Sequence, residues 1–436
     1  MNIRKYMFWL LDSLRGSKIG RHYRDIAAIF EDDGSVMQDK STEYRDAIFS
    51  YAKSKVPFYR QMADVERFEN LPLIDKSIVK NNFEQFHSVE FLGAKLHTMS
   101  TSGSTCTPFT VHQDSNKRRR VLAEILFFNR RVGYEVGHHL AYYRAITKES
   151  AKPWWLQKLQ NESLIDTADL GEDFLCHTAE KLERFPANTL LYGYASSMDV
   201  IGRHIYQSVL PEARKKYKIS SIITIAEAIS DQGRKILETI FQCPVVSRYS
   251  NQEMGILAQQ IPNDDFFVLN RASYHFEIFD MEKDVPVPHG RLGRIVITDL
   301  FNRAMPLLRY NTGDTGIIEK RDLNGISTDV LTTIEGRQLD YIRDTQGKLL
   351  SPAFVTTMMW NYQEILQFQF IQKNARDYLF RLNTGGKQFD REKDLIYRLQ
   401  KVLGEDANIA IEAINEIPVL ASGKRKYIIN EYSASL

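Results

Sequence analysis

The stretch TSGSTCTP, residues 101–108, gathers serine and threonine hydroxyls around one glycine. Ser102, Ser104 and Thr105 offer hydroxyl donors, and Gly103 permits the positive φ that brings backbone N–H groups close to an anion. Phosphate suits such a loop, although clusters of this composition are more often plain turns. The β-type residues FTV follow, whereas a Walker A loop opens directly into a helix, so the sequence disfavours a classical P-loop.

Four further motifs place charged or aromatic side chains downstream of this loop. RYSNQEMG puts Tyr249 four residues before Glu253, after a predicted strand and near its end, where α/β sheets usually bind ligands. LRYNTGDTG places Asp314 in a glycine-flanked turn, where a carboxylate can accept two hydrogen bonds from a ribose diol. EGR and ASGKRK contribute Arg337 and Lys424. Each residue alone is more often a turn former, a surface charge or part of a solvated tail.

The composition of the chain limits the classes of protein to which it can belong. A chain of 436 residues with 43% apolar content predicts a globular protein of two domains. Lys+Arg 57 against Asp+Glu 55 leaves a net charge of +2, which argues against nucleic-acid binding. Cys106, Cys176 and Cys243 lie far apart without CxxC spacing, which argues against a zinc site or disulfide framework and favours the cytoplasm. We interpret Cys106 as a small loop residue and not as a nucleophile.

The N-terminal segment MFWLL, residues 7–11, is too short for a signal-peptide core or a membrane span. With Arg4, Lys5, Arg15 and Lys18 around it, the segment is compatible with a helix on a membrane surface. A helix packed on the protein's own core is the interpretation that we favour.

Hydrophobic periodicity predicts mixed α/β and α+β architecture. A helix over 117–131 follows the hydroxyl-rich loop and a short strand, and strands alternate with helices over 181–250 as in a parallel sheet. The pattern over 266–343 is typical of an antiparallel or barrel-like region. The last hundred residues predict a small α+β unit, with strands over 365–372, 378–382 and 408–413 and a helix over 392–403. We therefore expect a large domain, 1–336, and a small mobile C-terminal domain, 337–436.

Taken together and in this order, the motifs resemble those of the adenylate-forming (ANL) superfamily. The likeness is greatest to the phenylacetate-CoA ligase branch and its CapK-like relatives in capsular polysaccharide biosynthesis. It spans nearly the whole chain, through VPFYR, LPLIDKSIVKNNF, TSGSTCTP, LLYGYASSM, ITIAEAIS, RYSNQE, RYNTGD, EGRQLDYI and SGKRK.

The resemblance implies a two-step reaction that depends on ATP and Mg²⁺. A carboxylic acid is activated as an acyl-adenylate, and an acceptor amine, hydroxyl or thiol then takes the acyl group. Carried over to this sequence, the residues assigned to the nucleotide are Ser102, Gly103, Ser104, Thr105, Glu227, Tyr249, Ser250, Asp314 and Arg337, with Glu253 assigned to the metal and Lys424 to catalysis. These residues suit the chemistry, because the carboxylate and the phosphates of ATP are both anions. Their negative charge must be neutralised in the transition state.

Three departures from the family's pattern bear on activity and on the acceptor. Cys106 replaces a loop glycine, Ser250 and Gln252 change the tyrosine motif, and Leu339 occupies the usual hinge position. With no obvious basic cluster for the 3′-phosphate of CoA, we favour an acceptor other than CoA, and the CapK-like resemblance implies one in polysaccharide assembly. The alternatives are an acyl-CoA synthetase like phenylacetate-CoA ligase, and a catalytically idle nucleotide-binding protein.

Overall fold

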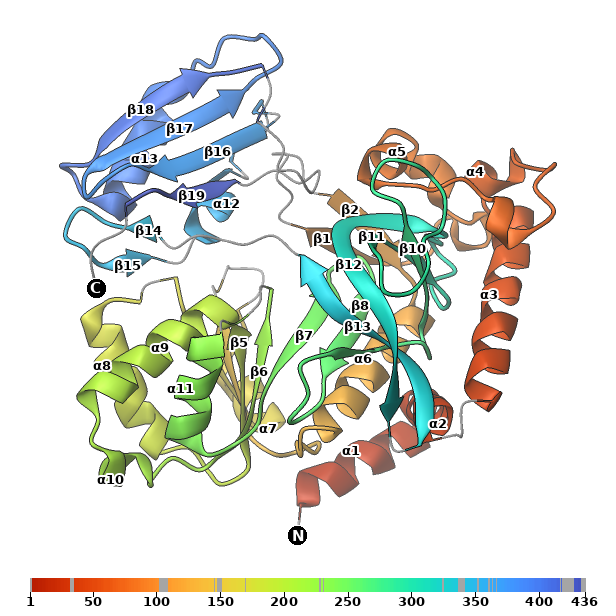
Figure 1. Cartoon of the computed structure of the whole chain (residues 1–436), viewed down its shortest axis with the longest axis horizontal. Coiled ribbons are helices and arrows are strands. Elements are labelled where there is room, and N and C mark those ends of the chain that lie inside the picture. The colour runs from red at the N-terminus through yellow and green to blue at the C-terminus, as the bar shows by residue number, and fades with distance from the viewer. Residues whose placement is uncertain are drawn as a thin grey trace. The chain divides into compact units, whose positions relative to one another are not determined.

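The chain is described by a computed structural model (Figure 1). It describes residues 2–31, 35–101, 109–144, 146, 151–168, 170–226, 229, 231–323, 325–335, 342–350, 353–359, 361–362, 364–365, 367–415, 417 and 427–432. They form two compact units, the first from 1–101, 109–137 and 246–336 and the second from 138–245 and 337–436. The domain boundary that the sequence suggests between residues 336 and 337 stays a prediction.

An antiparallel sheet forms the framework of the first unit. Its strands lie in the order β10–β11–β12–β13–β9–β8–β7. Their bounds are β7 Val245–Asn251, β8 Gly255–Gln260, β9 Phe267–Leu269, β10 Tyr274–Phe279, β11 Leu292–Asp299, β12 Tyr310–Leu323 and β13 Ile326–Glu335. Buried β-branched residues such as Ile295, Val296 and Ile297 fill the centre of β11, as expected for a strand covered on both faces. The antiparallel region predicted over 266–343 is confirmed.

Helices and a hairpin surround this sheet in the first unit. The hairpin pairs β1 His97–Thr101 with β2 Phe109–Gln113. The helices are α1 Ile3–Leu14, α2 Lys18–Glu31, α3 Ser35–Lys55, α4 Pro57–Arg60, α5 Lys76–Asn81 and α6 Ser115–Arg130. Asp75 caps α5 by accepting from Ile78 N at 2.8 Å, and Asp114 caps α6 by accepting from Lys117 N at 2.8 Å. Both caps lie one residue before a helix that borders the candidate site described below.

The second unit contains an α/β segment over 138–245. Its parallel strands lie in the order β6–β5–β3–β4, and Figure 1 shows α9 and α11 beside them. Met198 and Ile201 of α9 pack with Leu191 of β5 in one apolar cluster, which confirms the parallel sheet with crossover helices. The elements are β3 Leu140–Arg144, α7 Trp154–Gln160, β4 Glu162–Asp166, α8 Glu172–Glu183, β5 Thr189–Tyr194, α9 Ala195–Ser208, α10 Pro211–Arg214, β6 Ile219–Ile225 and α11 Asp231–Phe241.

The C-terminal part of the second unit is a small α+β structure with its own core. Four strands lie in the order β18–β17–β16–β19, and Leu395, Leu399 and Leu403 of one helix pack against them. The elements are β14 Ile342–Arg343, β15 Leu349–Leu350, α12 Ala353–Met359, β16 Gln367–Gln372, β17 Asp377–Asn383, α13 Glu392–Leu403, β18 Asn408–Ala413 and β19 Ile428–Asn430. This small unit is the one that the sequence predicts.

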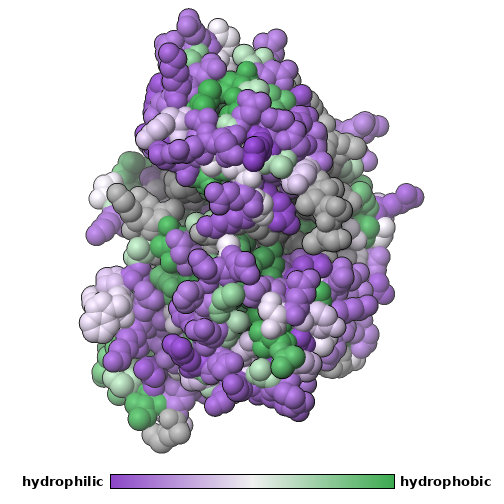
Figure 2. Space-filling model, turned by 90° about the vertical axis from the view of Figure 1, so that its left-hand side faces the viewer, coloured by the Kyte–Doolittle hydropathy of each residue, from purple (hydrophilic) through white to green (hydrophobic). Residues whose placement is uncertain are grey.

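The polarity of the surface bears on two expectations from the sequence, the absence of a membrane span and the packing of residues 7–11. The face seen in Figure 2 is mainly hydrophilic, with hydrophobic residues in small separate groups. Within the described residues, every helix is too short or too polar to cross a membrane. The expectation that segment 7–11 packs on the core is wrong in part, because Met7, Leu10 and Leu11 are exposed while Phe8 and Trp9 are half-buried.

Candidate active site

Two residues assigned to the nucleotide from sequence lie in direct contact in the first unit. Tyr249 is near the end of β7, and its Oη donates to Asp314 Oδ2 of β12 at 2.7 Å. The two residues are 65 positions apart in sequence. The antiparallel sheet therefore brings together an aromatic ring and a carboxylate that are distant in sequence.

A bulge in β12 positions the Asp314 carboxylate. Opposite β11, the pairing shifts between Arg294 and Val296, so three residues of β12 have no ladder partner in this pairing. Gly313 adopts φ +80°, a conformation that side chains disfavour, and Asp314 N donates to Thr312 Oγ1 at 3.1 Å. The sequence-based prediction of a glycine-flanked turn is therefore corrected: Asp314 projects from an irregular strand, because the ladder resumes at Thr315.

The Glu253 carboxylate, assigned to the metal, is buried and already has a cationic partner. Lys76 Nζ lies 3.0 Å from Glu253 Oε1, and Tyr310 Oη donates to the same oxygen at 3.3 Å. The Lys76 side chain is 34% exposed, whereas that of Glu253 is 4% exposed. The ammonium therefore reaches from the surface toward a carboxylate that is itself shielded from water.

Lys76 is a functional candidate that the sequence analysis did not single out. It begins α5, directly after Ile74 forms a bridge with Tyr310 of β12. Asn311 N donates to Ile74 O at 2.7 Å, which fixes the start of α5 beside β12. The only signal in the sequence is that Lys76 lies within LPLIDKSIVKNNF, a stretch that carried the family resemblance.

Burial and neighbouring carboxylates hold both phenols of the site in their protonated form. Burial, followed by the charge of Asp314, raises the pKa of Tyr249 well above its usual value. Burial, followed by the charge of Glu253, raises the pKa of Tyr310 in the same way. Because each phenol keeps its proton, each can donate a hydrogen bond to its carboxylate over the physiological pH range.

The residues present fit a magnesium ion that arrives with a nucleotide. Within the part of the chain that the structure describes, no group of three or more His, Cys, Asp or Glu side chains is arranged to hold a metal ion. Mg²⁺ commonly takes one or two carboxylates and completes its shell with water and substrate phosphates. Glu253 supplies one such carboxylate, so the donor set suits an ion shared with phosphate oxygens.

The remaining predicted site residues are distributed as follows. Ser250 lies on β7 opposite Ile256 of β8. Several positions named in the sequence analysis lie outside the described residues: Ser102, Gly103, Ser104, Thr105, Cys106, Glu227, Arg337, Leu339 and Lys424. The structure therefore brings together Tyr249, Asp314 and Glu253 with Lys76 and Tyr310, and the assignments of the other residues stay predictions.

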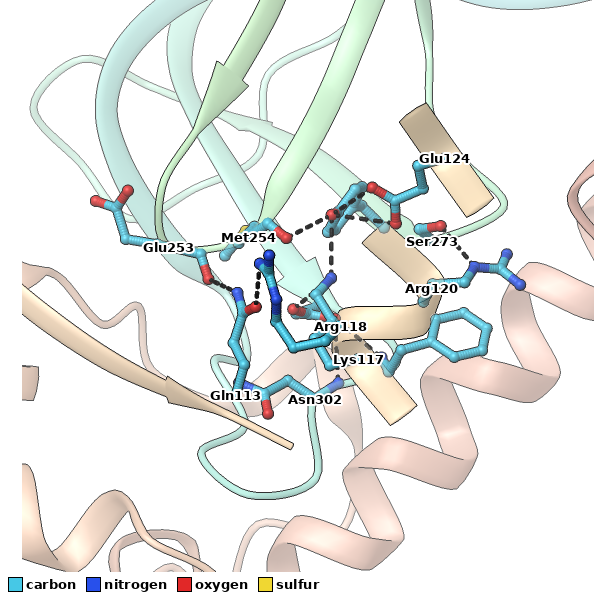
Figure 3. Close-up of polar contacts among 12 residues, drawn as sticks. Gln113, Lys117, Arg118, Arg120, Glu124, Glu253, Met254, Ser273 and Asn302 are labelled. Atoms are coloured by element: carbon cyan, nitrogen blue, oxygen red, sulfur yellow. Dashed lines mark hydrogen bonds and ion pairs between the residues drawn. The ribbon is translucent and has the colours of Figure 1, made fainter. Parts of the chain in front are cut away.

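A buried polar network supports the turn that carries Glu253 (Figure 3). Gln113 Nε2 donates to Glu253 O at 2.9 Å, and Tyr274 Oη lies 2.9 Å from Met254 O. Figure 3 shows the Glu253 carboxylate pointing away from this network while its backbone carbonyl faces Gln113. The network thus holds the backbone of the turn, while the carboxylate faces Lys76 and Tyr310 instead.

Lys117 is the cation at the centre of this network. Its side chain is fully buried, and Nζ lies 2.8 Å from Asp299 Oδ2 and donates to Tyr274 Oη at 3.0 Å. The same tyrosine contacts Glu124, whose pKa is raised by burial. Lys117 therefore links α6 to β10 and β11 and, through Tyr274, to the turn at Met254.

The chain shares the fold of a solved acyl-CoA ligase. It matches 2-hydroxyisobutyryl-CoA ligase in complex with 2-HIB-AMP and CoA in the thioesterification state, with a TM-score of 0.61 and 17% identity over 91% of this chain and 90% of that one. An open conformation of that ligase, also with 2-HIB-AMP and CoA, gives a TM-score of 0.56 and 16% identity over 90% of this chain and 91% of that one. The predicted fold class is confirmed.

Sequence comparison finds similarity to CapK proteins. Residues 342–431 match the family model of the CapK C-terminal domain. The chain is 24% identical over 406 residues to Protein CapK of Staphylococcus aureus, covering 88% of this chain and 87% of that protein. The resemblance to CapK-like proteins that the motifs indicate is thereby confirmed.

We predict that Lys117→Met destabilises the first unit by about 3–5 kcal/mol, because it leaves the buried Asp299 carboxylate without its cation. Urea denaturation measures the change in the free energy of unfolding. Lys215→Met is the matched control, since that lysine forms an exposed pair with Glu212 and is expected to contribute nearly nothing. Equal stability of the two variants would contradict the central position given to Lys117.

Proposed function

We propose that this protein is an adenylate-forming ligase that uses ATP and Mg²⁺ to activate a carboxylic acid. The observation that carries the proposal is the direct contact between Tyr249 and Asp314, two residues that the family resemblance assigns to the adenosine part of ATP. The proximity of Lys76 and Tyr310 to Glu253 supports a neighbouring site for phosphate and metal. The shared fold with an acyl-CoA ligase is consistent with both assignments.

In the proposed first step, a carboxylate oxygen attacks the α-phosphorus of ATP and pyrophosphate leaves, giving an acyl-adenylate. Tyr249 presents its ring to the base, and Asp314 accepts hydrogen bonds from the ribose hydroxyls. Glu253 would hold Mg²⁺, which when bound neutralises phosphate charge. Lys76 and Lys424 supply further positive charge, so that the chain contributes mainly positioning and electrostatic stabilisation.

In the proposed second step, an acceptor nucleophile attacks the acyl carbon and AMP leaves. The solved ligase of the same fold was crystallised with CoA, which supports a thiol acceptor. The likeness to Protein CapK supports an acceptor in polysaccharide assembly instead. Thioester formation with CoA, measured beside AMP release driven by amines or amino sugars, distinguishes these acceptors once an acid has been identified.

The nucleotide site is tested by ATP binding and by carboxylate-dependent pyrophosphate exchange screened over amino, hydroxy and aromatic acids. ATP with Mg²⁺ at 100 times its dissociation constant is expected to stabilise the protein by about 2.7 kcal/mol. Asp314→Asn should weaken ATP binding about tenfold or more, because hydrogen bonds to a charged group contribute about 1.5–3 kcal/mol.

Asp322→Asn is the control for this variant, because Asp322 lies at the exposed end of the same strand. It is expected to bind ATP like the unchanged protein. The absence of a thermal shift with any adenine nucleotide would refute the proposed function.

The Lys76–Glu253 ion pair makes a separate prediction about magnesium. Removal of the ammonium in Lys76→Met leaves Glu253 without a competing cation, so Mg²⁺ should bind more readily. The Mg²⁺ concentration for half-maximal pyrophosphate exchange is expected to fall about two- to fivefold, since a part-exposed ion pair contributes up to about 1 kcal/mol. Lys80→Met, on the same helix, is the control, and a rise in that concentration for Lys76→Met would contradict the competition.

Lys424 makes the last prediction of this section, from its motif alone. If its charge acts in the transition state, Lys424→Ala lowers pyrophosphate exchange by on the order of a hundredfold while ATP binding persists. Exchange rates and thermal shifts on the same preparation separate the two effects. Unchanged exchange would mean that Lys424 has no part in adenylation.

A further inference from the structure

The first helix of the chain presents an apolar face to solvent. Six large apolar residues of α1 are between 47% and 75% exposed: Ile3, Tyr6, Met7, Leu10, Leu11 and Leu14. At ~100° per residue they occupy about 140° of the helix circumference, so they form one continuous face. We call these six residues the α1 apolar face.

The opposite side of α1 is fixed to the first unit. Lys5 Nζ lies 2.6 Å from Glu135 Oε2, and Asn2 Nδ2 donates to Val136 O at 2.8 Å. The buried Asp12 carboxylate accepts from Gly20 N at 2.8 Å and from Ile19 N at 3.0 Å, so it caps the first turn of α2 and ties the end of α1 to it. Because these contacts occupy the inner side, α1 cannot rotate its apolar face toward the core without breaking them.

The inner side also carries the aromatic residues Phe8 and Trp9. Trp9 meets the ring of Tyr23 of α2 edge to face, with centroids 5.5 Å apart, and Phe8 packs on Trp9 at 5.1 Å. Figure 1 shows α1 beside α2 near the N-terminus. Phe8 and Trp9 therefore occupy the inner side of α1, and the apolar face stays in solvent.

Basic residues predominate in α1 and in the first turns of α2. Residues 2–24 contain one acidic side chain, Asp12, and the basic side chains Arg4, Lys5, Arg15, Lys18, Arg21 and Arg24. Asp12 is buried as the cap described above, so its charge is turned inward. Arg15, Lys18, Arg21 and Arg24 are exposed. An exposed apolar stripe in a segment with an excess of exposed basic residues is typical of a helix that lies in the interface of an anionic membrane.

We propose that α1 docks this protein onto the surface of a membrane that contains anionic lipids. The apolar face enters the headgroup boundary, and the exposed arginines and lysine meet the lipid phosphates. A second copy of the chain would cover the apolar residues equally well, but it would bring two positively charged segments together, and these would repel each other. Charge complementarity therefore selects the anionic lipid surface as the occupant.

Vesicle co-sedimentation of the full chain tests the proposal. The probes are vesicles of phosphatidylcholine alone and vesicles of phosphatidylcholine and phosphatidylglycerol in equal parts. Binding is expected only to the anionic vesicles and is expected to weaken as salt is raised. The variant Met7→Gln/Leu10→Gln/Leu14→Gln should weaken binding about tenfold or more, because three exposed side chains lose their apolar area.

A second variant isolates the charge contribution. Arg15→Gln/Lys18→Gln should weaken binding to anionic vesicles about fivefold for each charge removed, equivalent to ~1 kcal/mol per residue. The matched control is Leu92→Gln/Val285→Gln, which removes exposed apolar residues of the first unit outside α1 and should leave binding unchanged.

All three variants are expected to fold, because every substituted side chain is exposed. Thermal melts check this expectation. Equal binding to both kinds of vesicle, or unchanged binding by the α1 variants, would overturn the proposal. Sedimentation velocity without lipid tests the competing occupant. A dimer that dissociates in the Met7→Gln/Leu10→Gln/Leu14→Gln variant would assign the apolar face to a second copy of the chain and would equally overturn it.

Discussion

The first unit depends on the ion pair between the buried Lys117 ammonium and the Asp299 carboxylate. An isolated charge is expensive to remove from water, and here one cation meets the Asp299 carboxylate and the Tyr274 hydroxyl in a fully buried position. These partners belong to α6, β11 and β10, so the charge is satisfied only when a helix and two strands are assembled correctly. The turn at Met254 shares this requirement through Tyr274, and the position of Glu253 follows from it.

In the candidate site, antiparallel strand pairing brings together residues from motifs that are distant in sequence. Tyr249 and Asp314 belong to strands that are not neighbours in the sheet, yet the bulge before Thr315 directs the carboxylate to the phenol. Lys76 reaches Glu253 because Ile74 joins the edge of β12, which places the first residue of α5 at the site. The two contacts lie at the same end of β12, next to Tyr310.

Local pattern in the sequence was sufficient for the regular elements. The helix over 392–403 and the strand over 408–413 have the predicted bounds, since an amphipathic period and an alternating period are properties of the segment itself. Lys76 was missed because its partner, Glu253, is remote in the chain and no local period reports an ion pair between them. The exposure of Met7, Leu10 and Leu11 was missed for a related reason: a periodic apolar stripe shows that a face exists but does not show what covers it.

The cap that Asp12 provides has a consequence for the order in which the chain folds. Its carboxylate meets amides only seven and eight residues away, so the corner between α1 and α2 closes a short loop at little entropic cost. The contacts of Asn2 with Val136 and of Lys5 with Glu135 close loops of more than a hundred residues. On a growing polypeptide the helical corner can therefore form long before the surface that anchors it exists, and the first helix spends that interval tethered at one end only.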